Sequence, residues 1–401
     1  LGAGITVHGS QNGTVGASTL PLVNQGIIRA DTATKTITVL GNLVTNTGTL
    51  QSFNGGKLVV QTLDEQNSRP IAVAPGSSGT VNGQTVETSV PVILGSVQVQ
   101  VTGATIVTHG FQPFDTGGDS LWSLADAIRR RADDDNGGNE LAWLLDYDLT
   151  ADGGQGIFDP IPSGFEHSFL PSEGESRKGE LVFLFDWAPE SNQSSSGWGE
   201  AAGDTLFAML VDLGVVNPTA GVNNIPLHFI GHSFGAAVTS EAVERLARFN
   251  VPVDHLTYLD PHDFNQANLP IDGDQKLFEL GKPDGYGASV WNNVEFADVY
   301  YEVRGSNEGA FLPDAVVPLG RAIPGAYNLL LADNGALPDV NGNEFDGPYN
   351  GPLDGAGDHG YVWNTFYLGT VEKALPAGRP APENSSSFNF LQTGFAFSRI
   401  A

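Results

Sequence analysis

A chain of 401 residues is longer than a typical single hydrophobic core, so its length favours two domains, one of them large. Its 18 Lys and Arg against 46 Asp and Glu give a net charge of −28, which argues against binding to nucleic acids or anionic membranes and favours a neutral substrate. Because cysteine is absent, disulfides and thiolate chemistry are excluded.

The ends of the chain bear on its location. It carries no signal-peptide pattern and no apolar run long enough to span a bilayer, and it begins at Leu1 rather than methionine. We interpret it as a mature or trimmed piece of a longer exported protein, secreted or held at a bacterial type of cell surface. The sequence indicates no oligomeric state.

Residues 1–85 are predicted to form a small β-rich domain. Residues 23–28 are echoed by 45–50, and Gly26 and Gly48 are 48 − 26 = 22 residues apart. An alternating apolar strand follows each echo, at 36–39 and at 57–60. A β unit that repeats at this period suggests a parallel solenoid, similar to the β-helical passenger regions of secreted bacterial adhesins. A plain β-hairpin appendage is the alternative. We expect no chemistry from this segment.

Residues 86–401 are predicted to form the second domain, with the boundary inside the Gly-, Ser- and Pro-rich residues 70–91. Strands then alternate with helices, which is typical of a parallel sheet with crossover helices. Strands are expected at 104–108, 141–146, 181–185, 227–230, 256–259 and 294–303, and helices at 119–132, 198–213, 236–249 and 363–374. We interpret 148–179 and 305–357 as insertions and 388–397 as a closing strand.

The most informative motif is Gly-His-Ser-Phe-Gly at residues 231–235. A short apolar run leads into it and a helical sequence follows, which together form the strand, sharp turn and helix of a nucleophile elbow. Gly231 and Gly235 leave room around a strained turn at Ser233, and the helix directs its positive N-terminal end at that serine. The alternative is a strand-to-helix turn with an idle serine.

A serine nucleophile needs a base beside it, and in Gly-x-Ser-x-Gly folds the acid and then the histidine follow in the chain. Asp260 ends a strand 260 − 233 = 27 residues after Ser233, about one helix plus one strand, so we predict it to be the acid. Asp263 is the substitute. A turn-forming Asp-Pro pair is the alternative without chemistry. We predict His359, in a flexible stretch before the last helix, to be the base.

The other candidate histidines are given lesser roles. His262 lies too near Asp260 to loop back over the sheet, and His228, His232 and His255 lie on or beside strands, where structural roles are more economical. His232 is the one to which we also assign a supporting role behind the reacting groups.

A tetrahedral intermediate also needs hydrogen-bond donors. One is the backbone N–H of Phe234, the residue after the nucleophile. The second should come from a loop after an early strand, and the N–H of Phe111, after His109-Gly110, is our candidate. An ordinary His-Gly turn is the alternative.

Five motifs, taken together, resemble the α/β-hydrolase lipases, most closely the pancreatic-lipase-like group. They are 109–111, 185–187, 230–236, 259–261 and His359, in the same order over about residues 92 to 375. The resemblance implies an α/β-hydrolase core, a mostly parallel sheet with helices on both faces. It also implies hydrolysis of carboxylic esters without a required cofactor. Ser233, Asp260 and His359 would be its triad, and Phe111 and Phe234 its oxyanion hole.

The chain departs from that group in three ways. It has no cysteine for the disulfide that holds the family's lid between acid and histidine, it carries the extra segment 148–179, and we expect no lipid-binding domain after residue 375. The sequence therefore predicts a secreted lipase or carboxylesterase acting on a neutral lipid or polyester substrate. A polyester- or cell-wall-ester hydrolase and a non-catalytic surface adhesion module are the alternatives.

Three loops are rich in Asp and Asn, at residues 133–140, 272–274 and 339–358. Oxygen-rich, flexible loops suit Ca²⁺, but the loop at 339 lacks the glycine of an EF-hand and the loop at 133 has Leu144 where the bidentate Glu belongs. We interpret them as solvated acidic loops and predict no metal site, with structural calcium as the alternative.

Overall fold

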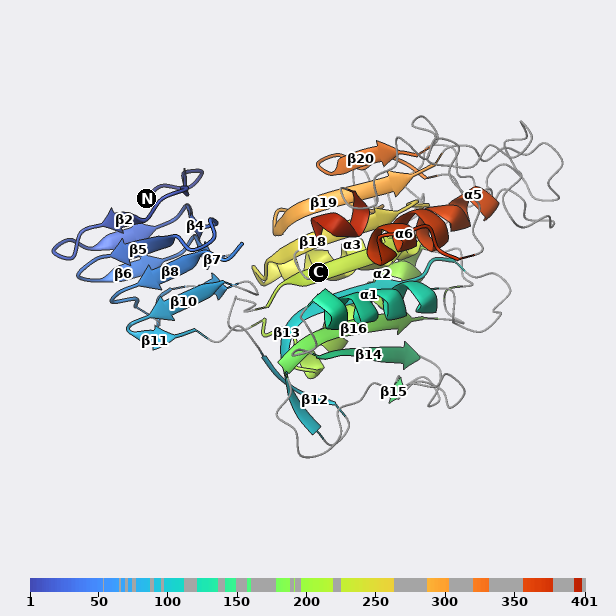
Figure 1. Ribbon diagram of the computed structural model, residues 1–401, viewed down its shortest axis with the longest axis horizontal. Coiled ribbons are helices and arrows are strands. Elements are labelled where there is room, and N and C mark those ends of the chain that lie inside the picture. Colours follow the sequence, from blue (N-terminus) through green and yellow to red (C-terminus); the bar gives the residue numbers. More distant parts are fainter. Residues whose placement is uncertain are drawn as a thin grey trace.

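Figure 1 shows a computed structural model of the protein, in which a stack of short N-terminal strands lies beside a large sheet flanked by helices. The structure describes residues 1–52, 54–64, 66–68, 71–73, 77–86, 90–94, 97–111, 121–135, 141–148, 157–159, 178–187, 191, 196–218, 225–262, 287–302, 320–331, 356–377 and 393–398. In these ranges, no helix combines the length and apolar character needed to cross a membrane.

The large sheet, as far as the structure describes it, has nine strands in the order β15-β14-β16-β13-β17-β18-β19-β20, with β12 paired to β13. The strands are β12 (Val90–Leu94), β13 (Val97–Thr108), β14 (Leu141–Asp148), β15 (Ile157–Asp159), β16 (Lys178–Asp186), β17 (Leu227–His232), β18 (Val253–Leu259), β19 (Val294–Tyr301) and β20 (Tyr327–Leu330). All pair in parallel except β12 and β15. The carboxyl ends of β13, β16, β17, β18 and β19 therefore meet at one edge, where ligands bind in open α/β sheets.

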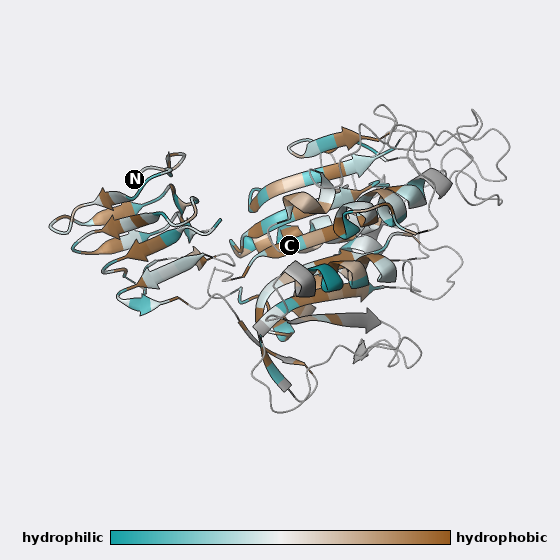
Figure 2. Cartoon of the chain, in the orientation of Figure 1, coloured by the Kyte–Doolittle hydropathy of each residue, from teal (hydrophilic) through white to brown (hydrophobic). Residues whose placement is uncertain are grey.

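Helices cover both faces of this sheet. Successive side chains of a strand point to opposite faces, so Ile106 packs in the cluster that includes α2 (Ser196–Asp212) and α3 (Gly235–Arg248). Val107 packs on the other side with α1 (Trp122–Asp135) and α6 (Leu368–Glu372). Burial on both faces explains why the central strands are apolar along their length, as the brown colour in Figure 2 shows. The predicted α/β core with a mostly parallel sheet is confirmed.

The predicted closing strand at 388–397 is wrong in its described part. Gly394–Phe397 is a 3₁₀ helix, η5, in which Gly394 has a φ of 62°. Its first two backbone N–H groups donate to side chains: that of Gly394 to Tyr300 OH at 2.8 Å, and that of Phe395 to Thr370 Oγ1 at 2.9 Å. Burial of the Phe395 ring makes this turn favourable.

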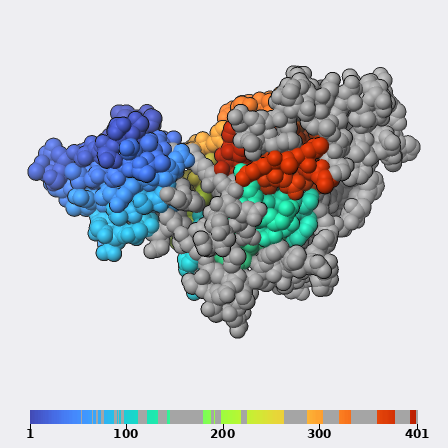
Figure 3. Space-filling model, in the orientation of Figure 1, coloured from blue at the N-terminus to red at the C-terminus, as the bar shows by residue number. Residues whose placement is uncertain are grey.

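The N-terminal strands stack in parallel ladders. They are β1 (Thr6–Val7), β2 (Gly13–Gly16), β3 (Leu22–Asn24), β4 (Ile27–Ala30), β5 (Thr36–Leu40), β6 (Val44–Asn46), β7 (Thr49–Ser52), β8 (Lys57–Val60), β9 (Ala72–Val73), β10 (Ser78–Val81) and β11 (Gln84–Thr85). The ladders run β1-β4-β7-β9, β2-β5-β8-β10 and β3-β6, with β11 antiparallel to β10. In Figure 3 these residues form a lobe beside the rest of the chain.

The 22-residue step seen in the sequence is the offset between β3 and β6 and between β4 and β7. Asn24 pairs with Asn46 in the β3–β6 ladder, and its Nδ2–H donates to Asn46 Oδ1 at 2.7 Å inside the stack. Glycine is needed at the matching corner, because a Cβ on Gly48 would lie 2.1 Å from the carbonyl oxygen of Gly26. One ion pair, Arg29 Nη2 with Glu295 Oε1 at 2.8 Å, joins this stack to the start of β19.

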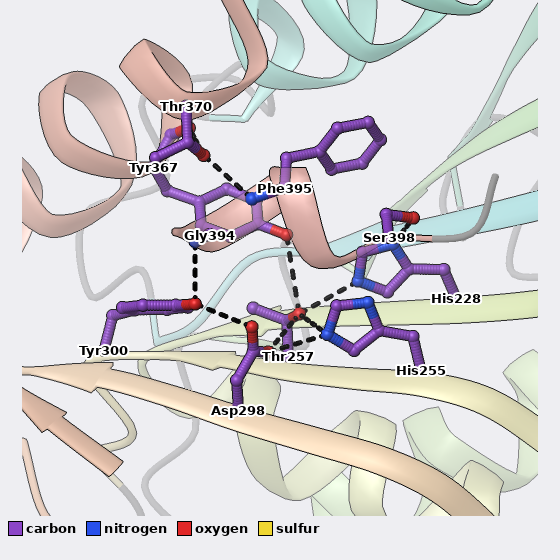
Figure 4. Close-up of polar contacts among 10 residues, drawn as sticks. All are labelled: His228, His255, Thr257, Asp298, Tyr300, Tyr367, Thr370, Gly394, Phe395 and Ser398. Carbon is purple, nitrogen blue, oxygen red and sulfur yellow. Dashed lines mark hydrogen bonds and ion pairs between the residues drawn. The ribbon is translucent and has the colours of Figure 1, made fainter. Parts of the chain in front are cut away.

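A buried polar network joins β18 and β19 to the C-terminal turn (Figure 4). Asp298 is fully buried. Its carboxylate accepts hydrogen bonds from Thr257 Oγ1 at 2.6 Å and Tyr300 OH at 2.8 Å. His255 Nε2 lies 3.0 Å from the same carboxylate, and the His228 ring stacks on His255 at 4.0 Å. The network therefore ties the strands that precede Ser233 and Asp260 to the end of the described chain.

Replacing Asp298 by alanine is expected to destabilise the protein by about 3–5 kcal/mol, because it leaves the buried partners of the carboxylate unpaired. Asp204→Ala is the matched control. Asp204 pairs with Arg245 at the surface, where its side chain is 52% exposed, so its loss should cost no more than about 1 kcal/mol. Chemical unfolding of both variants gives the comparison, and equal losses would contradict this role for Asp298.

Candidate active site

The nucleophile elbow lies between β17 and α3. Ser233 is in the left-handed region with a φ of 56°, and its N–H donates to the carbonyl of Leu259 at 3.0 Å. Such a conformation is strained for a residue with a Cβ and persists only where its surroundings hold it. The turn is also tightly packed. A Cβ on Gly231 would lie 2.5 Å from the carbonyl oxygen of Gly235, and one on Gly235 2.5 Å from that of His109.

The predicted acid lies at the end of the neighbouring strand. Asp260 follows β18 directly, has a φ of 45° and is completely buried. Its Oδ1 accepts the backbone N–H of Glu302 at 2.8 Å, and its Oδ2 accepts Nδ1–H of His359 at 2.5 Å. Gly320 packs against the carboxylate so closely that a Cβ there would lie 1.9 Å from Oδ1. Each carboxylate oxygen therefore has a donor, which fixes the orientation of the group.

His359 lies on a helix rather than in the flexible stretch expected from the sequence. α5 (Ala356–Tyr361) continues through a π-helical turn, η4 (Val362–Tyr367), into α6. The helix starts early because the side chains of Tyr361 and Val362 are buried under it. Burial lowers the pKa of His359 to about 3, with the charge of His262 as the second cause. At neutral pH the imidazole is therefore uncharged, as a general base must be.

The His109-Gly110 turn lies against the serine. A Cβ on Gly110 would lie 2.4 Å from Ser233 Cβ and 2.8 Å from both Ser233 Oγ and Phe234 N. The turn is held from β16: Trp187 Nε1–H donates to the carbonyl of His109 at 2.9 Å. Nε2 of His109 lies 2.9 Å from the Asp186 carboxylate. The hydroxyl of Ser233 and the N–H of Phe234 thus face the same turn.

The structure brings the predicted serine, acid and histidine to one edge of the sheet. His232 connects Ser233 to His359. It directly precedes Ser233 in the chain, and its Nε2–H donates to the backbone carbonyl of His359 at 3.3 Å. Phe111 follows Gly110 and packs against the core. Asp263, the substitute acid, lies outside the described residues.

Sequence reasoning assigned no role to Asp186, although it is the last residue of β16, at the same edge of the sheet as Asp260, and could have been found by that rule. Glu302 and Gly320 act through a backbone N–H and through the absence of a side chain, so no residue type in the sequence points to them.

In the ranges that the structure describes, no group of three or more His, Cys, Asp and Glu side chains is arranged to hold a metal. Asp133–Asp135 end helix α1. The rest of the acidic segments, at 136–140, 272–274 and 339–355, lies outside the described residues, as does nearly all of the 148–179 segment. Solvated acidic loops therefore stay the prediction for these segments, with structural calcium as the alternative.

Comparison with known proteins adds little. No protein-family model matches the chain, and no curated protein matches it. Among solved structures, it is similar to a proposed cell surface hydrolase from Lactobacillus plantarum WCFS1, with 14% identity over 53% of this chain and 74% of the other. The TM-score is 0.29. So low a score establishes no common fold, and the function must be argued from the site.

Proposed function

We propose that the protein is a serine hydrolase that cleaves carboxylic esters, as a lipase or carboxylesterase, through an acyl-enzyme on Ser233. The observation that carries this proposal is that two residues with strained backbone conformations lie at the ends of neighbouring strands. Ser233 and Asp260 both have positive φ at the ends of adjacent strands, and Asp260 holds His359 through a 2.5 Å hydrogen bond. Strain of this kind is concentrated at functional sites.

In the proposed reaction, Ser233 Oγ attacks the ester carbonyl carbon while Nε2 of His359 takes the hydroxyl proton. Asp260 binds Nδ1–H, so Nε2 is the ring nitrogen left for this transfer. The carbonyl oxygen becomes an oxyanion and is stabilised by the N–H groups of Phe234 and Phe111. Collapse expels the alcohol, which takes the proton from His359. Water then attacks the carbonyl carbon of the acyl-enzyme while Nε2 of His359 takes its proton. The bond to Ser233 Oγ breaks, His359 returns the proton to Oγ, and the carboxylic acid leaves.

The substrate class follows from charge. At a net −28 the protein repels anionic surfaces, so a neutral ester suits it better than a charged phosphoester. We place the protein outside the cell or at its surface, and we interpret residues 1–85 as a short parallel solenoid that carries the hydrolase domain, residues 86–401. The ladder of strands at the N-terminus supports this interpretation.

Hydrolysis of p-nitrophenyl esters from acetate to palmitate tests the proposal. We expect turnover with a clear optimum of chain length, short for a carboxylesterase and long for a lipase. Insoluble polyester and acetylated cell-wall polymer, assayed alongside, test for the alternative polymer hydrolase. Silence on every ester and polymer by a folded protein would contradict the proposal and favour a non-catalytic adhesion module.

A further inference from the structure

The ring of His109 is bound at both nitrogens, next to the predicted oxyanion hole. Nδ1 lies 2.8 Å from the carbonyl oxygen of Gly110, and Nε2 lies 2.9 Å from Oδ1 of Asp186. The side chain is 1% exposed, and its ring stacks on that of Trp187 with the centroids 5.8 Å apart and the planes 16° apart. These contacts fix the ring in one orientation.

The contact with Gly110 determines which ring nitrogen of His109 carries a proton. A carbonyl oxygen has no hydrogen to give, so the bond at Nδ1 forms only when Nδ1–H donates it. Nε2 has two polar neighbours, because the backbone N–H of Trp187 also lies within reach, at 3.1 Å. A neutral ring accepts from Trp187 at Nε2, and a charged ring donates to Asp186. In both forms Nδ1 keeps its proton.

This bond determines where the N–H of Phe111 points. The carbonyl of Gly110 and the N–H of Phe111 belong to one peptide group, which is planar and trans, so the two bonds point in opposite directions. With the carbonyl directed at the His109 ring, the N–H is directed away from it. The other end of the group is anchored too, because the Phe111 side chain packs against the core cluster that holds Trp187 and Phe234.

The turn that carries this peptide lies against the nucleophile. A Cβ on Gly110 would lie 2.8 Å from both Ser233 Oγ and the backbone nitrogen of Phe234. Gly110 therefore already touches the hydroxyl and the first proposed donor. A rotation of the peptide after Gly110 would turn the N–H of Phe111 away from the point where the oxyanion forms. Donors stabilise a transition state best when they are aimed at that point before the reaction begins.

We propose that His109 is a positioning residue: its Nδ1–H holds the Gly110 carbonyl so that the N–H of Phe111 points at the oxyanion, and Asp186 anchors the ring from β16. This inference rests on the proposed function, because it takes Ser233 to be the nucleophile and Phe111 to supply a donor. In this role His109 touches no reacting atom. It acts through the peptide on the transition state, so its loss should lower kcat and leave KM nearly unchanged.

Two amide substitutions separate the role of Nδ1 from that of Nε2. The amide N–H of asparagine can replace Nδ1–H but does not reach Asp186, whereas the longer glutamine reaches Asp186 and leaves the Gly110 carbonyl unbound. His109→Gln should therefore lower kcat by about 10- to 100-fold, less than the loss of about 10²–10³-fold that follows removal of a whole oxyanion donor. His109→Asn should recover most of that rate, since it restores the bond that orients the peptide.

The assay is steady-state hydrolysis of the best p-nitrophenyl ester by the whole chain, with thermal unfolding of each variant measured alongside. His228→Gln is the matched control. His228 is also a buried histidine, but its ring nitrogens contact Thr257 and Ser398 instead. The same substitution there should cost stability and leave kcat within a few-fold of the wild type.

Wild-type kcat in His109→Gln, or a loss in His109→Asn as large as that in His109→Gln, would overturn the inference and leave His109 a structural role. If His109→Gln does not fold, ¹⁵N-histidine NMR spectra of the wild type decide. The His109 ring must carry a proton at Nδ1, and a ring protonated at Nε2 alone would overturn the inference. A folded wild type that cleaves no ester would instead refute the proposed function, and this inference with it.

Discussion

Ser233→Ala is expected to lower kcat for ester hydrolysis by about 10⁵–10⁶-fold, because the remaining hydrogen-bond donors cannot replace the nucleophile. The substitution should leave the fold unchanged. Alanine keeps the Cβ that already tolerates the φ of 56°, and the backbone N–H still donates to Leu259. Initial rates on the best p-nitrophenyl ester, together with thermal unfolding, give both quantities.

Ser240→Ala separates loss of the nucleophile from loss of stability. Ser240 is a buried serine on the helix after the elbow, and its Oγ accepts hydrogen bonds from the N–H of Ser289 at 3.0 Å and Nε1–H of Trp291 at 3.1 Å. Its replacement should cost about 1–3 kcal/mol of stability and leave kcat within a few-fold. If Ser240→Ala were as inactive as Ser233→Ala, activity would depend on the integrity of the fold and not on the Ser233 hydroxyl.

Gly110→Ala is expected to reduce kcat by about 10²–10³-fold, the loss that follows removal of one oxyanion donor. The new methyl group would lie 2.4 Å from Ser233 Cβ and 2.8 Å from Phe234 N, so the turn must move away from both. That movement displaces the Phe111 N–H from the serine. The expected result is a fall in kcat with little change in KM, since the ground-state ester does not need the second donor.

Gly360→Ala is the control for this substitution. Gly360 follows His359, but a Cβ there would meet Asn364 Nδ2 at 3.4 Å, an ordinary contact. Alanine also stabilises a helix by about 0.5–1 kcal/mol relative to glycine. Gly360→Ala should therefore keep its activity. Full activity in Gly110→Ala would show that the His109-Gly110 turn takes no part in the reaction.

The elbow could be predicted from the sequence because its causes are local. An apolar run, two glycines around Ser233 and an amphipathic helix specify strand, turn and helix over a dozen residues. Asp260 was found by a rule of position, because residues that end parallel strands meet at one edge of the sheet. The α/β core followed from the alternation of elements along the chain.

The supporting residues could not be predicted because their causes are long-range. Glu302 and Gly320 contact Asp260 through the backbone, and His262 reaches His359 only after the chain has folded. The early start of the helix at His359 was missed because Tyr361 and Val362 are buried in the cluster that also holds side chains of α1, and local propensity does not encode such long-range packing. Residues 388–397 were expected to form a strand, but the backbone N–H groups of Gly394 and Phe395 donate to the side chains of Tyr300 and Thr370, which are distant in the sequence.

The most direct test of the account is covalent labelling of the folded protein with a fluorophosphonate, followed by intact mass and peptide mapping. The account predicts one adduct per chain, on Ser233, that forms slowly in His359→Ala and does not form in Ser233→Ala or in unfolded protein. An unlabelled Ser233 in folded wild type, or equal labelling of Ser233→Ala, would contradict the claim that this serine is an activated nucleophile.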